Sequence, residues 1–221
     1  MNVEVEDDGP RVYSYRVVQE YSHDPLAFTQ GLLWLNGTFY ESTGLYGQSS
    51  VREVRLTGEV VRQDALHKKD FGEGLVHVGS GELLQLLWRT GEGNRFNVKA
   101  GNGGHVRRGT RFKTPFRDGW GLEFDGSSLL LTDSGPKVFF LDPNKFSVRR
   151  SVTVKDAGRV VEMINELEFI QGELWANVYG QDCLARIAPS TGVVQGWVVL
   201  DNLLDRKHAN EEATKAHRNP P

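Results

Sequence analysis

The sequence predicts an all-β fold built from four copies of one strand-rich unit. Three observations support this: a short motif recurs four times, a glycine turn follows every copy, and β-forming residues fill the runs between turns. The four motifs are Gln30-Gly31-Leu32, Glu73-Gly74-Leu75, Trp120-Gly121-Leu122 and Asn165-Glu166-Leu167. Their leucines lie 43, 47 and 45 residues apart. A period of about 40–50 residues is typical of four-stranded blades, so we expect a β-propeller.

Each motif begins a series of four predicted strands. The turns after the first strands contain Gly37, Gly81, Gly126 and Gly172. Short apolar runs between Gly, Pro and Asn turns are the pattern of antiparallel strands, and Asn36-Gly37 is a typical hairpin turn. The predicted third strands are Val51–Leu56, Arg95–Val98, Lys137–Leu141 and Cys183–Ile187. The predicted fourth strands are Val60–Asp64, Val106–Phe112, Ser147–Val154 and Val193–Leu200.

Two segments flank the repeats. We interpret residues 1–11 as an acidic tail, residues 12–204 as one propeller domain, and residues 205–221 as a polar C-terminal segment. Val12–Tyr21 is predicted as a strand that completes the last blade. The C-terminal segment is either a short helix over Ala209–Ala216 or a disordered tail. Four full repeats end near Leu204, so a fifth repeat would begin where the chain stops.

Composition excludes several classes of function. A net charge of −3, from 26 basic and 29 acidic residues, indicates neither a nucleic acid nor a membrane as partner. No apolar stretch approaches the roughly 20 residues of a membrane span. Met1–Pro10 contains no signal-peptide core, which favours a cytosolic form, and the alternative is a secretory protein whose leader has been removed. The six histidines lack metal-ligand spacing. The single cysteine, Cys183, excludes an intrachain disulfide and is predicted to be a buried apolar residue.

The residue two positions before each repeat leucine is the candidate functional position. Equivalent positions of the innermost strands of a propeller converge on one axis, so these four residues should gather in one place. They are Gln30, Glu73, Trp120 and Asn165. The two amides carry donors and acceptors, which suits recognition of a primary carboxamide and its oxyanion. The alternative is that they satisfy backbone groups at the mouth of the channel.

Glu73 is the candidate for proton transfer. Gly72 and Gly74 flank it and let the backbone turn sharply, which would leave its carboxylate open to a ligand. Burial beside Phe71 would raise its pKa from about 4.3, toward the range in which general bases work best. The alternative is a solvated turn carboxylate, but the shared repeat position favours a functional role.

Aromatic residues are expected to form the walls of the site. Trp120 occupies the repeat position, while Trp88 and Trp175 both end second-strand runs and have Phe28 and Phe71 as neighbours. Such walls would pack on a ligand and exclude water. The remaining tryptophans, Trp34 and Trp197, are assigned to the core. Glu166 and Glu168 are expected to pair with arginines or cap turns.

Several of these segments resemble the plant-type glutaminyl cyclases (glutaminyl-peptide cyclotransferases) and their bacterial relatives. The resemblance covers most of residues 13–204 and is carried by His23–Leu32, Glu41–Gly47, Phe71–Gly74, Gly119–Leu122, Asn165–Glu168 and Trp175–Tyr179. It implies a five-bladed propeller that converts N-terminal glutamine of peptides and proteins to pyroglutamate with release of ammonia. It also implies that no metal or other cofactor is needed. We expect a monomer. Relatives in plants enter the secretory pathway.

The resemblance assigns roles to individual residues. Glu73 and Asn165 would be catalytic. The residues that would bind substrate are Phe28, Gln30, Phe71, Trp88, Trp120 and Trp175. The family's fifth repeat begins with an Asn-Gly-Ile-Ala motif and later carries a Gly-Lys whose lysine belongs to the active site. This chain ends at Pro221 without either motif. We expect a truncated fifth repeat, and the alternative is a propeller that is open or rebuilt.

Two alternatives remain open at this point. The first is a non-catalytic propeller that binds peptide N-termini or serves as a scaffold, because a fold alone does not determine activity. The second is a propeller hydrolase or lactonase, which would need metal-binding carboxylates or histidines that the sequence pattern does not provide.

Overall fold

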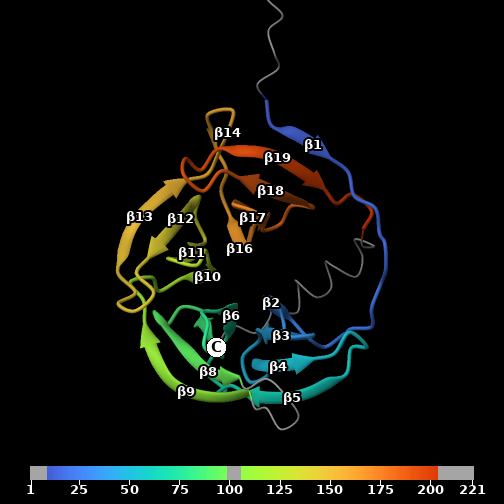
Figure 1. The fold of residues 1–221 in the computed structure, drawn as a ribbon, viewed down its shortest axis with the longest axis vertical. Coiled ribbons are helices and arrows are strands. Elements are labelled where there is room, and N and C mark those ends of the chain that lie inside the picture. Colours follow the sequence, from blue (N-terminus) through green and yellow to red (C-terminus); the bar gives the residue numbers. More distant parts are fainter. Residues whose placement is uncertain (1–8, 99–105, 204–221) are drawn as a thin grey trace, which may run out of the picture.

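A computed structural model describes residues 9–98 and 106–203, which form a β-propeller arrangement of four blades around a central axis (Figure 1). The first blade contains β2 (Thr29–Leu35), β3 (Thr38–Thr43), β4 (Ser50–Val54) and β5 (Val60–Ala65). The second contains β6 (Gly72–His77), β7 (Glu82–Leu87), β8 (Glu92–Val98) and β9 (Val106–Lys113). Each blade is an antiparallel sheet in sequence order, as the repeat predicts.

The third and fourth blades have the same topology. The third contains β10 (Gly119–Phe124), β11 (Leu129–Asp133), β12 (Lys137–Leu141) and β13 (Val148–Thr153). The fourth contains β16 (Ile164–Ile170), β17 (Glu173–Val178), β18 (Cys183–Ile187) and β19 (Val194–Val199). In Figure 1 the first strand of every blade lies near the axis and the fourth lies at the rim. The predicted third and fourth strands agree with these bounds to within a few residues.

The N-terminal strand differs from the prediction. Only β1 (Arg11–Tyr13) forms, and it pairs in parallel with β19 as a fifth, outermost strand of the fourth blade. The chain from Ser14 to Phe28 then passes along the rim without regular structure to the first blade (Figure 1). The predicted strand over Val12–Tyr21 is therefore too long. The predicted alternatives for Ala209–Ala216 lie outside the described residues.

The hydrophobic core consists of three clusters, one between each pair of consecutive blades. Leu75 belongs to the cluster between the first and second blades, Leu122 to the next cluster, and Leu167 to the last. These three repeat leucines therefore lie in the clusters that join each blade to the preceding one. Leu32 is 42% exposed whereas Leu75 is 3% exposed, because no described sheet precedes the first blade.

The same asymmetry corrects one core assignment. Trp34 lies two residues after Leu32 on β2, so both side chains point to the same face of the strand. Trp34 is half exposed and packs edge-on against Phe39, with ring centroids 4.6 Å apart. Trp197 is partly buried against the last core cluster, as is Cys183, which is less buried than predicted.

Two further features complete the fold. A hairpin of β14 (Lys155–Asp156) and β15 (Arg159–Val160), which the repeat does not predict, connects the third blade to the fourth. The predicted Asn-Gly hairpin is confirmed, since Asn36 and Gly37 have φ values of 53° and 85°, as a type I′ turn requires. Within residues 9–98 and 106–203, no helix is long and apolar enough to cross a membrane.

Candidate active site

A β-bulge interrupts the innermost strand of every blade at the repeat motif. The pairing register shifts between Thr29 and Gly31, Gly72 and Leu75, Gly119 and Leu122, and Ile164 and Leu167. A bulge inserts one extra residue into a strand and re-aims its side chain. The four candidate residues, Gln30, Glu73, Trp120 and Asn165, lie in these bulges. The repeat therefore encodes a backbone irregularity as well as a strand.

The glycine after the candidate residue lets consecutive inner strands approach closely. A Cβ on Gly31 would lie 2.6 Å from Leu75 N, and one on Gly121 would lie 2.3 Å from Asn165 O. Gly74 has the same role toward the third blade, where Leu122 N would lie 2.5 Å from its Cβ. Such distances exclude a side chain, which explains the recurrence of glycine.

The four candidate residues line one pocket of about 390 Å³. It lies where the inner strands begin and the second strands end. Three more of the predicted site residues, Phe28, Phe71 and Trp88, also line it. The sequence did not identify five other lining residues: Arg89, Asp118, Ser134, Met163 and Tyr179.

Glu73 occupies the buried end of this pocket. Its side chain is 4% exposed, and Gln30 Nε2 donates a hydrogen bond to Glu73 Oε2 at 2.7 Å. Burial raises the pKa of Glu73 well above its usual value. The bond from Gln30 opposes this rise in the pKa, and the charge of Asp118 adds to it. No cation is paired with Glu73 among the described ion pairs, so its carboxyl is suited to both accept and donate a proton.

Hydroxyl groups from neighbouring blades hold the backbone of two candidate residues. Ser42 Oγ donates to the carbonyl of Glu73 at 2.5 Å, and Thr132 Oγ1 donates to the carbonyl of Asn165 at 2.8 Å. Gln85 Nε2 in turn donates to Ser42 Oγ at 2.7 Å. The first and third of these hydrogen bonds are buried, and all three hold the bulges from which the side chains project.

Aromatic rings form one wall of the pocket. Phe71 lies with its ring centroid 6.1 Å from Phe28, 5.5 Å from Tyr46 and 5.2 Å from Trp88. Trp88 Nε1 donates to Asp118 Oδ1 at 2.7 Å, which fixes the orientation of the indole. Edge-on and tilted contacts of this kind stabilise a rigid apolar surface.

Trp120 and Tyr179 also line the pocket, and their ring centroids are 5.5 Å apart. Over the first wall, the guanidinium of Arg89 lies 4.1 Å from the centre of the Trp88 ring. This cation–π contact brings a positive charge to the rim of a pocket that contains Glu73 and Asp118.

The structure does not place Trp175 in this pocket. Trp88 directly follows β7, whereas Trp175 is the third residue of β17. The residue that directly follows β17 is Tyr179, about 13 Å farther along the strand at ~3.3 Å per residue. Trp88, Ser134 and Tyr179 lie 13, 12 and 12 residues after their repeat leucines. A second position of the repeat, 12 or 13 residues after each leucine, would therefore have identified Ser134 and Tyr179.

Trp175 lines a neighbouring cavity of about 380 Å³ between β2 and β16, which shares Gln30 and Asn165 with the first pocket. Glu166, Glu168 and Asn177 also line it. Asn177 Oδ1 accepts the Glu166 amide at 2.9 Å, which makes Asn177 a support of the fourth bulge. The Nε1 atom of Trp175 is buried without a hydrogen-bond partner.

The expectation that Glu166 and Glu168 pair with arginines is wrong. No described ion pair includes either residue. Burial and neighbouring carboxylates raise the pKa of Glu166 well above its usual value, and its Oε2 atom is buried without a partner. Burial, followed by the charge of Glu123, raises the pKa of Glu168 to about 7. The two side chains therefore face other acids rather than bases.

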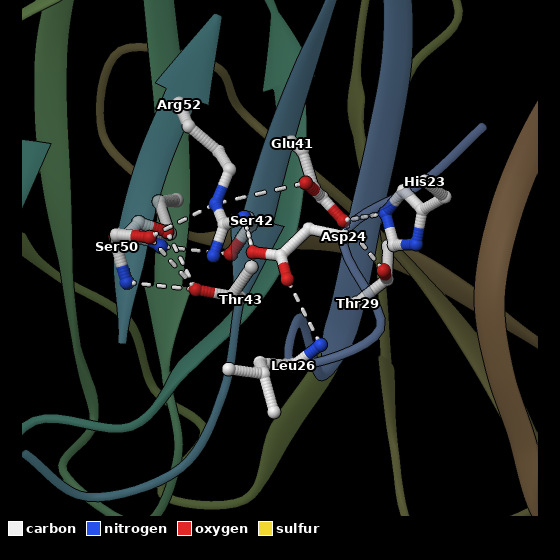
Figure 2. Close-up of polar contacts among 10 residues, drawn as sticks. His23, Asp24, Leu26, Thr29, Glu41, Ser42, Thr43, Ser50 and Arg52 are labelled. Atoms are coloured by element: carbon white, nitrogen blue, oxygen red, sulfur yellow. Dashed lines mark hydrogen bonds and ion pairs between the residues drawn. The ribbon is translucent and has the colours of Figure 1, made fainter. Parts of the chain in front are cut away.

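A polar network anchors the chain just before β2 (Figure 2). The buried Glu41 Oε1 accepts a hydrogen bond from Thr29 Oγ1 at 2.6 Å and lies 2.8 Å from His23 Nε2. Arg52 Nη1 donates to Asp24 Oδ2 at 2.8 Å, and this hydrogen bond lowers the pKa of Asp24. The network fixes the entry into β2, and thus the positions of the neighbouring Phe28 and Gln30.

No group of three or more His, Cys, Asp or Glu side chains in the described parts of the chain has an arrangement that could hold a metal ion.

Comparison with known proteins gives a consistent result. A protein-family model described as "Glutamine cyclotransferase" matches residues 1–216. The glutaminyl-peptide cyclotransferase of Arabidopsis thaliana is 42% identical over 195 residues, which are 87% of this chain and 59% of the plant protein. The chain thus spans about 59% of the length of that curated relative.

Solved structures agree. The crystal structure of Myxococcus xanthus glutaminyl cyclase matches with a TM-score of 0.77 and 30% identity, over 96% of this chain and 84% of that one. The WD40 β-propeller domain of Doa1 matches with a TM-score of 0.53 and 10% identity, over 77% of this chain and 53% of that one. The second match is a likeness of fold alone.

Proposed function

Because the chain belongs to the glutamine cyclotransferase family, we propose that it converts the N-terminal glutamine of peptides and proteins to pyroglutamate with release of ammonia. The observation that carries the proposal is the buried carboxyl of Glu73, which has an amide as its hydrogen-bond partner and opens into an aromatic pocket. A carboxyl with a raised pKa in a pocket that excludes water is suited to proton transfer.

In the proposed reaction, the free α-amine of the substrate attacks the carboxamide carbon of its own side chain. A carbon–nitrogen bond forms and closes the ring, while the carbonyl oxygen becomes an oxyanion. Glu73 accepts the proton of the attacking amine and then donates it to the leaving nitrogen. The original carbon–nitrogen bond breaks and ammonia departs. All atoms are accounted for, and Glu73 returns to its initial state.

The pocket contributes by fixing the folded shape of the substrate. Orientation of two groups within one molecule can supply about 7–11 kcal/mol of the barrier. We propose that Phe28, Phe71, Trp88 and Trp120 hold the aliphatic part of the glutamine side chain. Gln30 keeps the Glu73 carboxyl in place through its 2.7 Å hydrogen bond. Tyr179 takes the wall position that the sequence assigned to Trp175.

Asn165 is proposed to donate a hydrogen bond to the oxyanion. Its backbone carbonyl is fixed by Thr132, and its side chain lines the pocket with Glu73. A preorganised donor at this position stabilises charge that develops only in the transition state. The steps need a proton acceptor, a donor and a closed pocket, so we propose an acyl transfer that requires no metal.

We further propose that residues 12–204 belong to a single, monomeric propeller domain with five units, the fifth lying between β16 and β2. Three observations support a neighbour at that place: Leu32 is exposed, Trp175 Nε1 is buried without a partner, and Glu166 replaces the glycine of the other inner strands. A crystal structure and the molar mass from light scattering test the unit count and the monomer.

Ammonia release from a peptide that begins with glutamine tests the proposed function. We expect release by the wild-type protein and a loss of about 10²–10⁴-fold in kcat for Glu73→Gln, which keeps the shape but cannot shuttle a proton. Glu59→Gln, at an exposed ion pair with Arg55, is the matched control and should retain full activity. A folded wild-type protein that binds the peptide without releasing ammonia would establish the non-catalytic alternative. Equal rates for wild type and Glu73→Gln would remove Glu73 from the mechanism.

A further inference from the structure

A second hollow continues directly from the candidate active site. It is a groove of about 720 Å³, and it shares Met163 and Tyr179 with the active-site pocket. One side is formed by the β14–β15 hairpin and the residues that lead into β16. The other side is formed by β19 and the adjoining ends of β17 and β18. Because Met163 and Tyr179 line both the pocket and the groove, a ligand that extends out of the pocket past Tyr179 enters the groove.

The groove has an apolar floor that faces solvent. Val160 is 48% exposed and Tyr179 is 41% exposed, while Val161 and Trp197 are partly buried beside them. Contiguous apolar residues at the surface, with polar residues at their edge, mark sites of interaction. Arg159, Glu162 and Gln181 provide that polar edge.

The hairpin wall is held in a fixed position. Ala157 and Gly158 have φ values of 44° and 82°, the left-handed pair that a tight type I′ turn requires. Lys155 forms a parallel bridge with Val193, and Trp197 Nε1 donates to Asp156 Oδ2 at 3.1 Å. The indole N–H is thereby satisfied within the protein, so the Trp197 ring offers an apolar contact.

We propose that this groove binds the second and third residues of the substrate peptide and favours apolar side chains there. The inference rests on the proposed function, in which the first residue fills the pocket and its carbonyl end must point outward. Two extended residues span roughly 7 Å, so the second and third residues would follow the groove directly beyond Tyr179. Apolar side chains would be removed from water on Val160 and Trp197, whereas charged ones would lose part of their hydration on this apolar floor.

Three substrates test the proposal with the wild-type protein: glutamine amide, a Gln-Leu-Leu peptide and a Gln-Asp-Asp peptide. We expect kcat/KM for the leucine peptide to exceed that for the aspartate peptide by about 10-fold or more, the size of a discrimination made by one apolar subsite. Equal kcat/KM values for the leucine and aspartate peptides would overturn the proposal that the groove binds the second and third residues. No ammonia from any of the three would instead overturn the proposed function.

A variant locates the preference. Val160→Asp should lower the ratio of kcat/KM for the leucine peptide to kcat/KM for glutamine amide by about 10-fold. The matched control is Val148→Asp, an equally exposed valine of β13 that does not line the groove, and it should leave this ratio unchanged. Val160→Thr, which keeps the shape of the side chain, should lower the ratio in the same direction. An unchanged ratio in both Val160 variants would show that the preference arises elsewhere.

Discussion

Two regions of this propeller bury carboxyl groups in opposite ways. Along the axis, Glu73 and Glu166 have raised pKa values because they are buried among amides and other acids. In the first blade, Glu41 contacts His23 and Arg52, and the same arginine lowers the pKa of Asp24. Burial alone therefore does not mark a reactive carboxyl. Among the described ion pairs, Glu73 and Glu166 have no cationic partner, whereas Glu41 and Asp24 both have one.

The largest expected effect on stability comes from breaking the anchor. Glu41→Ala leaves the buried Arg52 with one carboxylate fewer, and removing one member of a buried pair costs about 3 kcal/mol or more. Urea unfolding measures the change. The control is Glu59→Ala at the exposed pair with Arg55, which should change stability by less than ~1 kcal/mol. Similar values for the two variants would contradict an anchoring role for Glu41.

An intermediate effect tests the aromatic wall. Tyr179→Ala removes a ring that contacts Trp120 and should raise KM for a glutamine-initiated peptide by about 10-fold, the equivalent of ~1.4 kcal/mol. Trp175→Ala should change KM less than Tyr179→Ala does, because its ring lines the neighbouring cavity between β2 and β16 and not the pocket that contains Glu73. Steady-state kinetics distinguish the two. A larger change in KM for Trp175→Ala would restore the sequence-based assignment.

The smallest effect concerns pH. The pKa of Glu168 is about 7 in the folded protein, above its unfolded value near 4.5. The folded state therefore holds the proton more tightly, and this contribution is complete below pH 4.5 and is lost as pH rises through 7. Since Glu168 is exposed at the edge of its cavity, solvent screening limits the loss to about 1 kcal/mol.

Thermal unfolding at pH 5 and pH 8 measures this term. Glu168→Gln should lose less stability over that range than the wild type does. Asp142 makes stability depend on pH in the opposite direction, because hydrogen bonds from Lys145, Arg149 and Asn144 lower its pKa to about 2. Its contribution is present above the unfolded pKa near 3.8 and is lost as pH falls through 2. Identical slopes between pH 5 and 8 for wild type and Glu168→Gln would contradict the shift at Glu168.

Much of the architecture could be predicted from the sequence because the repeat is encoded locally. Turn glycines and the spacing of the leucines identified the strands of all four described blades. The period also identified residues that share a pocket, since equivalence in the repeat becomes proximity at the axis. The catalytic and binding roles of those residues stay predictions.

The features that were missed depend on contacts between distant segments. The sequence predicted that an N-terminal strand completes the last blade, but not that only Arg11–Tyr13 would pair with β19, since no local pattern specifies how far this pairing extends. Trp175 was misplaced because the pattern gives the strand but not the position at which the strand reaches the pocket. The pairing of Glu166 and Glu168 with arginines was misjudged because only the folded arrangement brings the carboxyl group of Glu123 beside them.

The repeated bulge has a consequence for engineering. Four equivalent bulges, three with a following glycine and two held by a hydroxyl group of the preceding blade, carry an amide, a carboxylate, an indole and a second amide. The backbone geometry is thus common to the four positions while the chemistry differs at each. These four positions are therefore suited to side-chain substitution in protein design, because the backbone of the sheets that hold them stays the same.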